Sequence, residues 1–89
     1  MPTWKPAAIA DRKRIIAYIA QDKPRTAIKL GDLLMEKAGL LDLYPLLGPA
    51  GRVKGTRELT VHPNYILIYR IVGEVVEVLR VKHAAQQRP

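Results

Sequence analysis

The sequence predicts an α+β fold, in which an N-terminal helical hairpin packs on a small, mainly antiparallel β-sheet. Two stretches with helical periodicity fill the first half of the chain, and the β-branched residues gather in residues 57–83. Helices followed by a run of strands are typical of α+β architecture. With 89 residues, the chain fits a single domain spanning residues 1–89, whose core is thin because so short a chain buries only about 60–65% of its unfolded surface.

The N-terminus predicts a short edge strand followed by a first helix. Pro2 and Pro6 exclude a central strand, because proline donates no ladder hydrogen bond, but Trp4 can turn inward from an edge strand. In residues 7–20, isoleucines recur near the helical period of 3.6 residues, whereas Asp11, Arg12, Lys13 and Arg14 fill the remaining arc. We therefore expect a helix with one apolar face, provided by Ile9, Ile15, Ile16 and Ile19.

A second helix is predicted over residues 25–43, antiparallel to the first because the connection is short. Asp22 is expected to cap this helix two residues before Pro24, which is tolerated in a first turn. Tyr44 and Pro45 end the helix, and a loop rich in glycine and proline follows. The buried stripe should consist of Ala27, Leu30, Leu34, Ala38 and Leu41.

Residues 57–83 predict three antiparallel strands, separated by turns at residues 62–64 and 73–74. The second turn places Arg70 opposite Glu77 and Ile68 opposite Leu79, and the first places Leu59 opposite Ile68. A one-residue slip would exchange the two faces. Because one helical hairpin covers a single face, the other is covered either by a partner or by residues 46–53 together with Trp4. The first face should carry Leu59, Val61, Ile66, Ile68, Leu79 and Val81.

Composition limits the chemistry that the chain can perform. It has no cysteine, which excludes disulfides, thiolate metal sites and cysteine nucleophiles, and we expect neither a metal nor another cofactor. A signal peptide and a membrane span are not expected, so a cytoplasmic location is predicted. The net charge of +7 calls for a negatively charged partner, such as nucleic acid, an acidic protein or an anionic membrane surface, or else serves solubility alone.

Basic residues on or beside the predicted sheet are candidates for contact with a negatively charged target. In phosphodiester cleavage, His83 would act as general acid or base while Arg80 and Arg70 stabilise developing charge. The simpler alternatives are an ion pair between Arg70 and Glu77 and a surface role for His83. The basic set comprises Arg52, Lys54, Arg57, Arg70, Arg80 and Lys82.

Three segments, residues 55–59, 65–70 and 80–83, resemble the RelE/ParE superfamily of toxins from bacterial type II toxin–antitoxin modules. RelE-like members are ribosome-dependent mRNA endonucleases that usually have an arginine at the position of Ile66 and another at about Ala84. ParE-like members lack both arginines, and their resemblance implies poisoning of DNA gyrase without covalent chemistry by the toxin. The sequence is closer to the ParE-like members. Related chains often end in an aromatic residue where this one has Arg88.

The resemblance implies a cognate antitoxin that forms a hetero-oligomer with the toxin and has an acidic toxin-binding segment. We expect this segment to fold on binding and to cover the helical hairpin or the apolar sheet face. A non-toxic nucleic-acid-binding module is the third alternative, although the aromatic residues form no stripe with the basic ones. Antitoxin contacts are expected at Ile15, Ile19, Leu59, Val61, Ile66 and Ile68.

Overall fold

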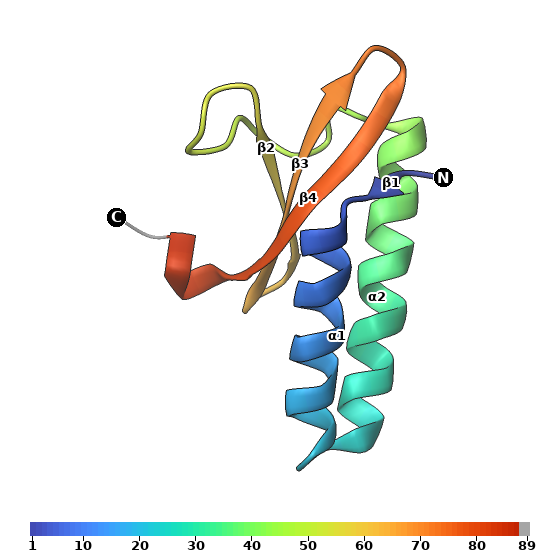
Figure 1. The fold of residues 1–89 in the computed structure, drawn as a ribbon, viewed down its shortest axis with the longest axis vertical. Helices are drawn as coiled ribbons and strands as arrows, with labels where there is room; N and C mark the ends of the chain where they lie inside the picture. Colours follow the sequence, from blue (N-terminus) through green and yellow to red (C-terminus); the bar gives the residue numbers. More distant parts are fainter. Residues whose placement is uncertain (88–89) are drawn as a thin grey trace.

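The fold is given by a computed structural model that describes residues 1–87 (Figure 1). The elements are β1 (Thr3–Trp4), α1 (Pro6–Ala20), α2 (Pro24–Leu43), β2 (Arg57–His62), β3 (Tyr65–Val72), β4 (Val75–His83) and a short 3-10 helix, η1 (Ala84–Gln87). The sheet has the order β1-β4-β3-β2, with β1 parallel to β4 and the other pairs antiparallel. The predicted α+β fold with a short edge strand is confirmed. Arg88 lies outside the described residues.

Both helices begin with a proline in the first turn, where its missing N–H costs no hydrogen bond. The predicted cap at Asp22 is wrong, because Lys23 is the N-cap residue of α2 and no side chain caps the helix. Asp22 instead belongs to the turn between the helices, where its backbone N–H donates to the carbonyl of Ile19. No helix within residues 1–87 is long and apolar enough to cross a membrane.

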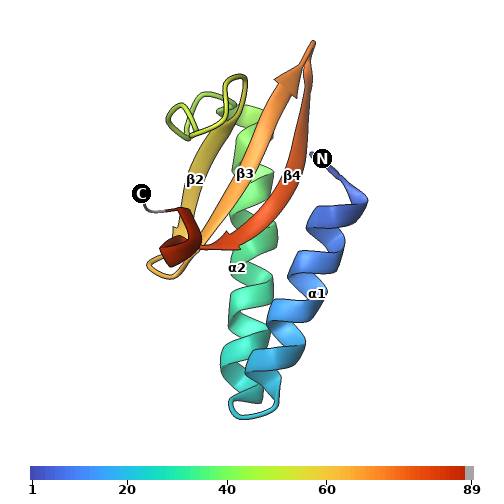
Figure 2. The ribbon, with the colours of Figure 1, turned by 60° about the vertical axis from the view of Figure 1, so that its left-hand side comes forward.

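The core lies between the helical hairpin and one face of the sheet (Figure 2). All five residues of the predicted α2 stripe are buried, which confirms that stripe. The side chains of Tyr69, Leu67 and Val78 are fully buried beneath the helices. The sheet contributes Leu59, Val61, Leu67, Tyr69, Val76, Val78 and Val81 to this core.

The predicted register between β2 and β3 is wrong by one residue. Leu59 pairs with Leu67 rather than with Ile68, and the ladder is irregular between Thr60 and His62. This slip brings Leu67 into the core with Leu59 and leaves Ile66 on the opposite face. As expected for a strand with side chains on alternating faces, one residue of shift exchanged the faces of β3.

The predicted register between β3 and β4 holds only up to a β-bulge. Arg70 pairs with Glu77 as expected, but Ile68 pairs with Arg80 because Leu79 is an extra residue on β4. The bulge keeps both Val78 and Val81 on the buried face, which strict alternation would not allow.

Neither Trp4 nor the loop formed by residues 44–56 covers the face of the sheet away from the helices. Trp4 packs on the helical side, where the guanidinium of Arg12 lies 4.5 Å from its ring centroid. The loop follows the edge of β2, and the backbone N–H of Glu58 donates to the carbonyl of Pro49. Among the described residues, this outer face therefore has no covering helix apart from the short η1 beside β4.

Candidate functional site

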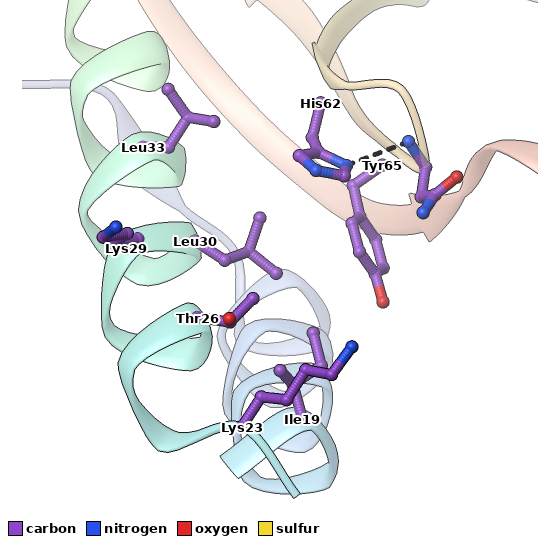
Figure 3. A pocket seen from close by; sticks show the side chains of 9 residues that line it. Ile19, Lys23, Thr26, Lys29, Leu30, Leu33, His62 and Tyr65 are labelled. Carbon is purple, nitrogen blue, oxygen red and sulfur yellow. Dashed lines mark hydrogen bonds between the residues drawn. The ribbon is translucent and has the colours of Figure 1, made fainter.

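An apolar groove separates the tip of the helical hairpin from the turn between β2 and β3 (Figure 3). Its volume is about 460 Å³. The helices line it with Ile19, Lys23, Thr26, Lys29, Leu30 and Leu33, and the strands line it with His62, Asn64 and Tyr65. Leu30 and Tyr65 face each other across the groove, as Figure 3 shows.

The groove combines an apolar lining with positive charge. Lys23 and Lys29 stand at its helical side, and none of the nine described lining residues carries a carboxylate. The turn opposite is fixed locally, because the backbone N–H of Asn64 donates to Nδ1 of His62 at 3.1 Å. An amphipathic peptide segment with acidic residues has the matching chemistry.

A second cavity, which we call the basic pocket, lies on the other side of Tyr65. Its volume is about 270 Å³. The ring of His83 meets the ring of Tyr65 edge-on at a centroid distance of 5.4 Å. The pocket is lined by Asp11, Arg14, Ile15, Tyr18, Tyr65, Val81, Lys82, His83 and Gln86.

Asp11 forms the polar floor of the basic pocket and is only 1% exposed. Its carboxylate accepts hydrogen bonds from Arg80 Nε at 2.7 Å and Nη2 at 2.9 Å, and from Arg14 Nη2 at 2.6 Å. It also accepts the backbone N–H of Val81 at 2.9 Å. Because β1 ends at Trp4, opposite Val78, no strand within residues 1–87 pairs with this part of β4 on the edge away from β3, and Asp11 takes the place of one.

These contacts keep Asp11 ionised. Burial by itself raises the pKa of Asp11, but the hydrogen bonds from Arg80 and the Val81 N–H lower it to about 2. The same pair raises the pKa of Arg80 above its ordinary value. The predicted place of Asp11, on the arc outside the apolar face of the first helix, is wrong, because Asp11 and Ala8 are the buried residues of α1. The spacing of Ala8, Asp11 and Ile15, which puts them on one stripe, is the signal in the sequence.

The three candidate catalytic residues are not brought together. His83 pairs with Tyr65 on β3, whereas Arg70 pairs with Glu77. Tyr65 and Arg70 are five residues apart, which is about 17 Å along a strand. Arg70 donates from Nε to Glu77 Oε1 at 2.7 Å, so the cross-strand ion pair is present, and this hydrogen bond lowers the pKa of Glu77.

The ring of His83 is itself engaged in a local hydrogen bond. Its Nδ1 accepts the backbone N–H of Ala85 at 3.2 Å, at the start of η1. The neutral ring then carries its proton on Nε2, so it offers no free lone pair for a general base in this arrangement.

Comparison with known proteins identifies the family. The family described as "ParE toxin of type II toxin-antitoxin system, parDE" matches residues 3–88. The chain belongs to this ParE toxin family. It is 39% identical over 87 residues to the toxin Y4kP of Sinorhizobium fredii, covering 97% of this chain and 90% of that protein. It is 34% identical over 84 residues to toxin RelE2 of Caulobacter vibrioides, covering 94% of this chain and 92% of that protein.

Solved structures show the same fold. The chromosomal ParDE toxin–antitoxin system from P. aeruginosa contains a chain that matches with a TM-score of 0.80 at 24% identity, over 93% of this chain and 96% of that chain. A chain of the YoeB–YefM complex from Staphylococcus aureus matches with a TM-score of 0.62 at 19% identity, over 92% of this chain and 93% of that chain. The pairing of two helices with a mixed four-stranded sheet is thus shared with other toxin–antitoxin proteins.

In this ParE-family chain, two of the predicted basic residues are held by hydrogen bonds within the chain. Arg80 is bound to Asp11, and Arg57 donates to the carbonyl of Gly48 at 2.7 Å. Arg52 lies on the loop, where its Nη1 is 3.5 Å from the carbonyl oxygen of Gln86. Lys54 is exposed on the same loop, and Lys82 lines the basic pocket.

The predicted antitoxin contacts are also divided among several places. Leu59 and Val61 are 8% and 6% exposed and belong to the core. Ile66 and Ile68 are on the outer face of the sheet, which leaves two predicted residues at the cavities. Ile19 lines the groove and Ile15 lines the basic pocket.

Residues at the cavities that sequence reasoning missed include Tyr65, Leu33 and Lys23. Tyr65 lines both cavities, and it sits beside the turn at residues 62–64 that the sequence already indicated. Helical periodicity alone gave no signal for Leu33 or Lys23, because the groove depends on how far the hairpin tip stands from this turn.

Proposed function

We propose that this chain is the toxin of a type II toxin–antitoxin pair and that a co-encoded antitoxin neutralises it. Membership of the ParE toxin family supports this function. The solved relatives come from a ParDE toxin–antitoxin system and from the YoeB–YefM and DinJ–YafQ complexes, which supports an antitoxin partner. The groove with its two lysines suits an acidic, amphipathic segment that folds as it binds.

The target that we propose is DNA gyrase, inhibited by binding and without covalent chemistry by the toxin. The observation that carries this choice is the dispersal of the candidate ribonuclease groups. Arg80 is bound to Asp11, Arg70 pairs with Glu77 about 17 Å along the strand from the His83 position, and Ile66 carries no charge. Cleavage of a phosphodiester needs such groups around one scissile bond.

A RelE-like mRNA endonuclease is the second candidate. It is favoured by the relatives named RelE2 and RelE1, both 34% identical to this chain. His83 and Lys82 also line one cavity, so this candidate would use His83 as the acid and Lys82 as the positive charge.

Two readouts from the same induced cells separate the targets. Under the gyrase proposal, expression should lower DNA supercoiling and cause DNA damage while mRNA stays intact. Co-expression of the protein encoded beside this gene should relieve both effects. Cleavage of mRNA within codons, with normal supercoiling, would overturn the gyrase proposal and support the endonuclease.

Replacement of His83 tests the endonuclease directly. An enzyme that uses this ring for proton transfer should lose about 10²–10⁴-fold in cleavage rate in both His83→Ala and His83→Asn. The asparagine variant is the matched control, because its amide oxygen can still accept the N–H of Ala85. Loss in the alanine variant alone would point to a structural role for His83. A gyrase inhibitor should not depend on proton transfer by this residue.

A further inference from the structure

Tyr65 joins the groove and the basic pocket into one continuous surface. Its side chain lines both cavities, and its ring packs edge-on against His83 on the pocket side. Ile19 and Tyr18 are neighbours on α1, and they line the groove and the pocket respectively. A peptide that lies in the groove therefore meets the basic pocket within a few residues.

The two cavities have different chemistry. The groove is mainly apolar, whereas the pocket is lined by Arg14, Lys82 and His83. Asp11 is the one carboxylate among the described pocket residues, and Arg80 offsets its charge with two hydrogen bonds. Arg14 and Lys82 thus leave the pocket with an excess of positive charge.

The donors of the pocket are also suited to an oxyanion. The amide oxygen of Gln86 accepts the backbone N–H of His83 at 3.3 Å, which leaves the amide nitrogen to donate. The volume of about 270 Å³ is below the range of about 300–1,000 Å³ typical of small-molecule sites. This size fits one acidic side chain better than a whole metabolite.

We propose that the basic pocket binds a carboxylate of the same antitoxin segment whose apolar residues occupy the groove. Recognition then has two parts, an apolar anchor on one side of Tyr65 and a charge-assisted contact with Arg14 and Lys82 on the other. This inference rests on the proposed antitoxin partner. It adds a specific requirement, an acidic residue close in sequence to the apolar anchor.

Charge-neutralising variants test the pocket against its surroundings. The probe is the purified protein encoded beside this gene, and its affinity for the toxin is measured by calorimetry at low and high salt. Arg14→Gln and Lys82→Gln should each weaken binding about tenfold. Lys13→Gln is the matched control, because it removes one positive charge from an exposed position of α1 outside both cavities, and it should change the affinity less than about twofold.

Each variant is first checked for folding by urea denaturation. Arg14→Gln removes one partner of Asp11, whereas Lys82→Gln leaves that cluster intact, so the test remains decisive if Arg14→Gln is unstable. Replacing the acidic residues of the probe one at a time should identify one carboxylate whose loss abolishes the effect of Lys82→Gln. Such coupling in a double-mutant cycle would support a direct contact.

Three results would overturn the inference. If Lys82→Gln and Lys13→Gln weakened antitoxin binding equally, the contribution of Lys82 would be general electrostatic attraction and not a specific contact. If Lys82→Gln lost binding to a fluorescent single-stranded RNA while its affinity for the antitoxin stayed unchanged, the pocket would be assigned to a phosphate instead. If the neighbouring protein fails to bind the wild-type toxin at all, the antitoxin proposal fails and the pocket inference fails with it, an outcome distinct from binding that ignores the pocket.

Discussion

The two ends of the sheet differ in how their polar and apolar groups are used. At the closed end, α2 stops and residues 44–56 run beside β2. Tyr69 is fully buried there, and its hydroxyl donates to the carbonyl of Pro45 at 2.6 Å. The same hydroxyl accepts the N–H of Gly48 at 2.9 Å, and Arg57 donates to the Gly48 carbonyl. At the open end, by contrast, Tyr65 and Lys23 line a groove.

This difference suggests a division between stability and recognition. Contacts at the closed end are made within the chain and fix the loop to the sheet, whereas the open end presents the apolar and basic side chains that we propose as the antitoxin site. Asp11 has both roles, because it joins β4 to α1 by a hydrogen bond and also lines the basic pocket. Substitutions should therefore affect the free energy of unfolding at the closed end and at Asp11, and affect binding at the open end.

The largest loss of stability is expected for Asp11→Ala. It removes a buried acceptor from Arg80, Arg14 and the Val81 N–H, and breaking such a cluster costs about 3 kcal/mol when one partner remains partly exposed. Urea denaturation measures the loss. Asp32→Ala, at an exposed position of α2, is the control and should change the free energy of unfolding by less than about 0.5 kcal/mol. Equal losses in Asp11→Ala and Asp32→Ala would show that the Asp11 cluster adds nothing to the free energy of unfolding.

The pH dependence of stability should report the same carboxylate. The pKa of Asp11 is about 2 in the folded chain against an ordinary value of 3.8, so the unfolded chain takes up the proton first as the pH falls. Its contribution of about 2 kcal/mol is fully present above the ordinary value and is lost between about pH 4 and pH 2. Denaturation at several pH values should show this loss in the wild type. The difference between wild type and Asp11→Asn should shrink over the same interval.

Two glycines provide a matched test of the closed end. A Cβ at Gly48 would lie 2.9 Å from both the Glu58 carbonyl oxygen and Tyr69 Cε1, so Gly48→Ala should cost about 1–3 kcal/mol. In the described structure, a Cβ at Gly39, inside α2, would meet no heavy atom within 4 Å apart from its chain neighbours and the nearby backbone of its own helix. Gly39→Ala should stabilise the helix by about 0.4–1 kcal/mol. Thermal denaturation of both variants measures these changes. If both variants were stabilised or both destabilised, the expected difference between the two glycines would be wrong.

The smallest effect on stability is expected at the open end. Lys23→Glu reverses a charge at the groove and should change the free energy of unfolding by less than about 0.5 kcal/mol. Its association with the antitoxin should nevertheless slow at low salt, because charges at an interface rim act mainly on the association rate. Stopped-flow kinetics measure this rate. A large loss of stability instead would erase the distinction between the two ends.

Much of the fold followed from local patterns in the sequence. The period of apolar residues predicted both helices and the buried stripe of α2, and the Gly73-Glu74 turn correctly paired Arg70 with Glu77. Local patterns failed where distant packing decides. The extra residue at Leu79 and the shift near His62 depend on which side chains fit beneath the helices, so the predicted faces of β3 and β4 were partly wrong.

The site was harder to predict than the fold for the same reason. Ile15 and Ile19 were among the expected contacts and do line the two cavities, because α1 reaches the open end. Arg80 was assigned to a target, whereas in the structure it binds Asp11, 69 residues earlier in the chain. A contact between residues so far apart in the chain leaves no short-range pattern, and it forms because α1 packs against β4.

The short length of β1 leaves part of β4 at the edge of the sheet. Beyond Trp4, β4 is an edge strand, and an edge with free backbone N–H groups can serve as a template for another strand. Here the N–H of Val81 is already bound to Asp11, that of His83 is bound to Gln86, and the bulge at Leu79 disrupts the regular spacing. Asp11, Gln86 and the bulge together make this open edge a poor template for a further strand.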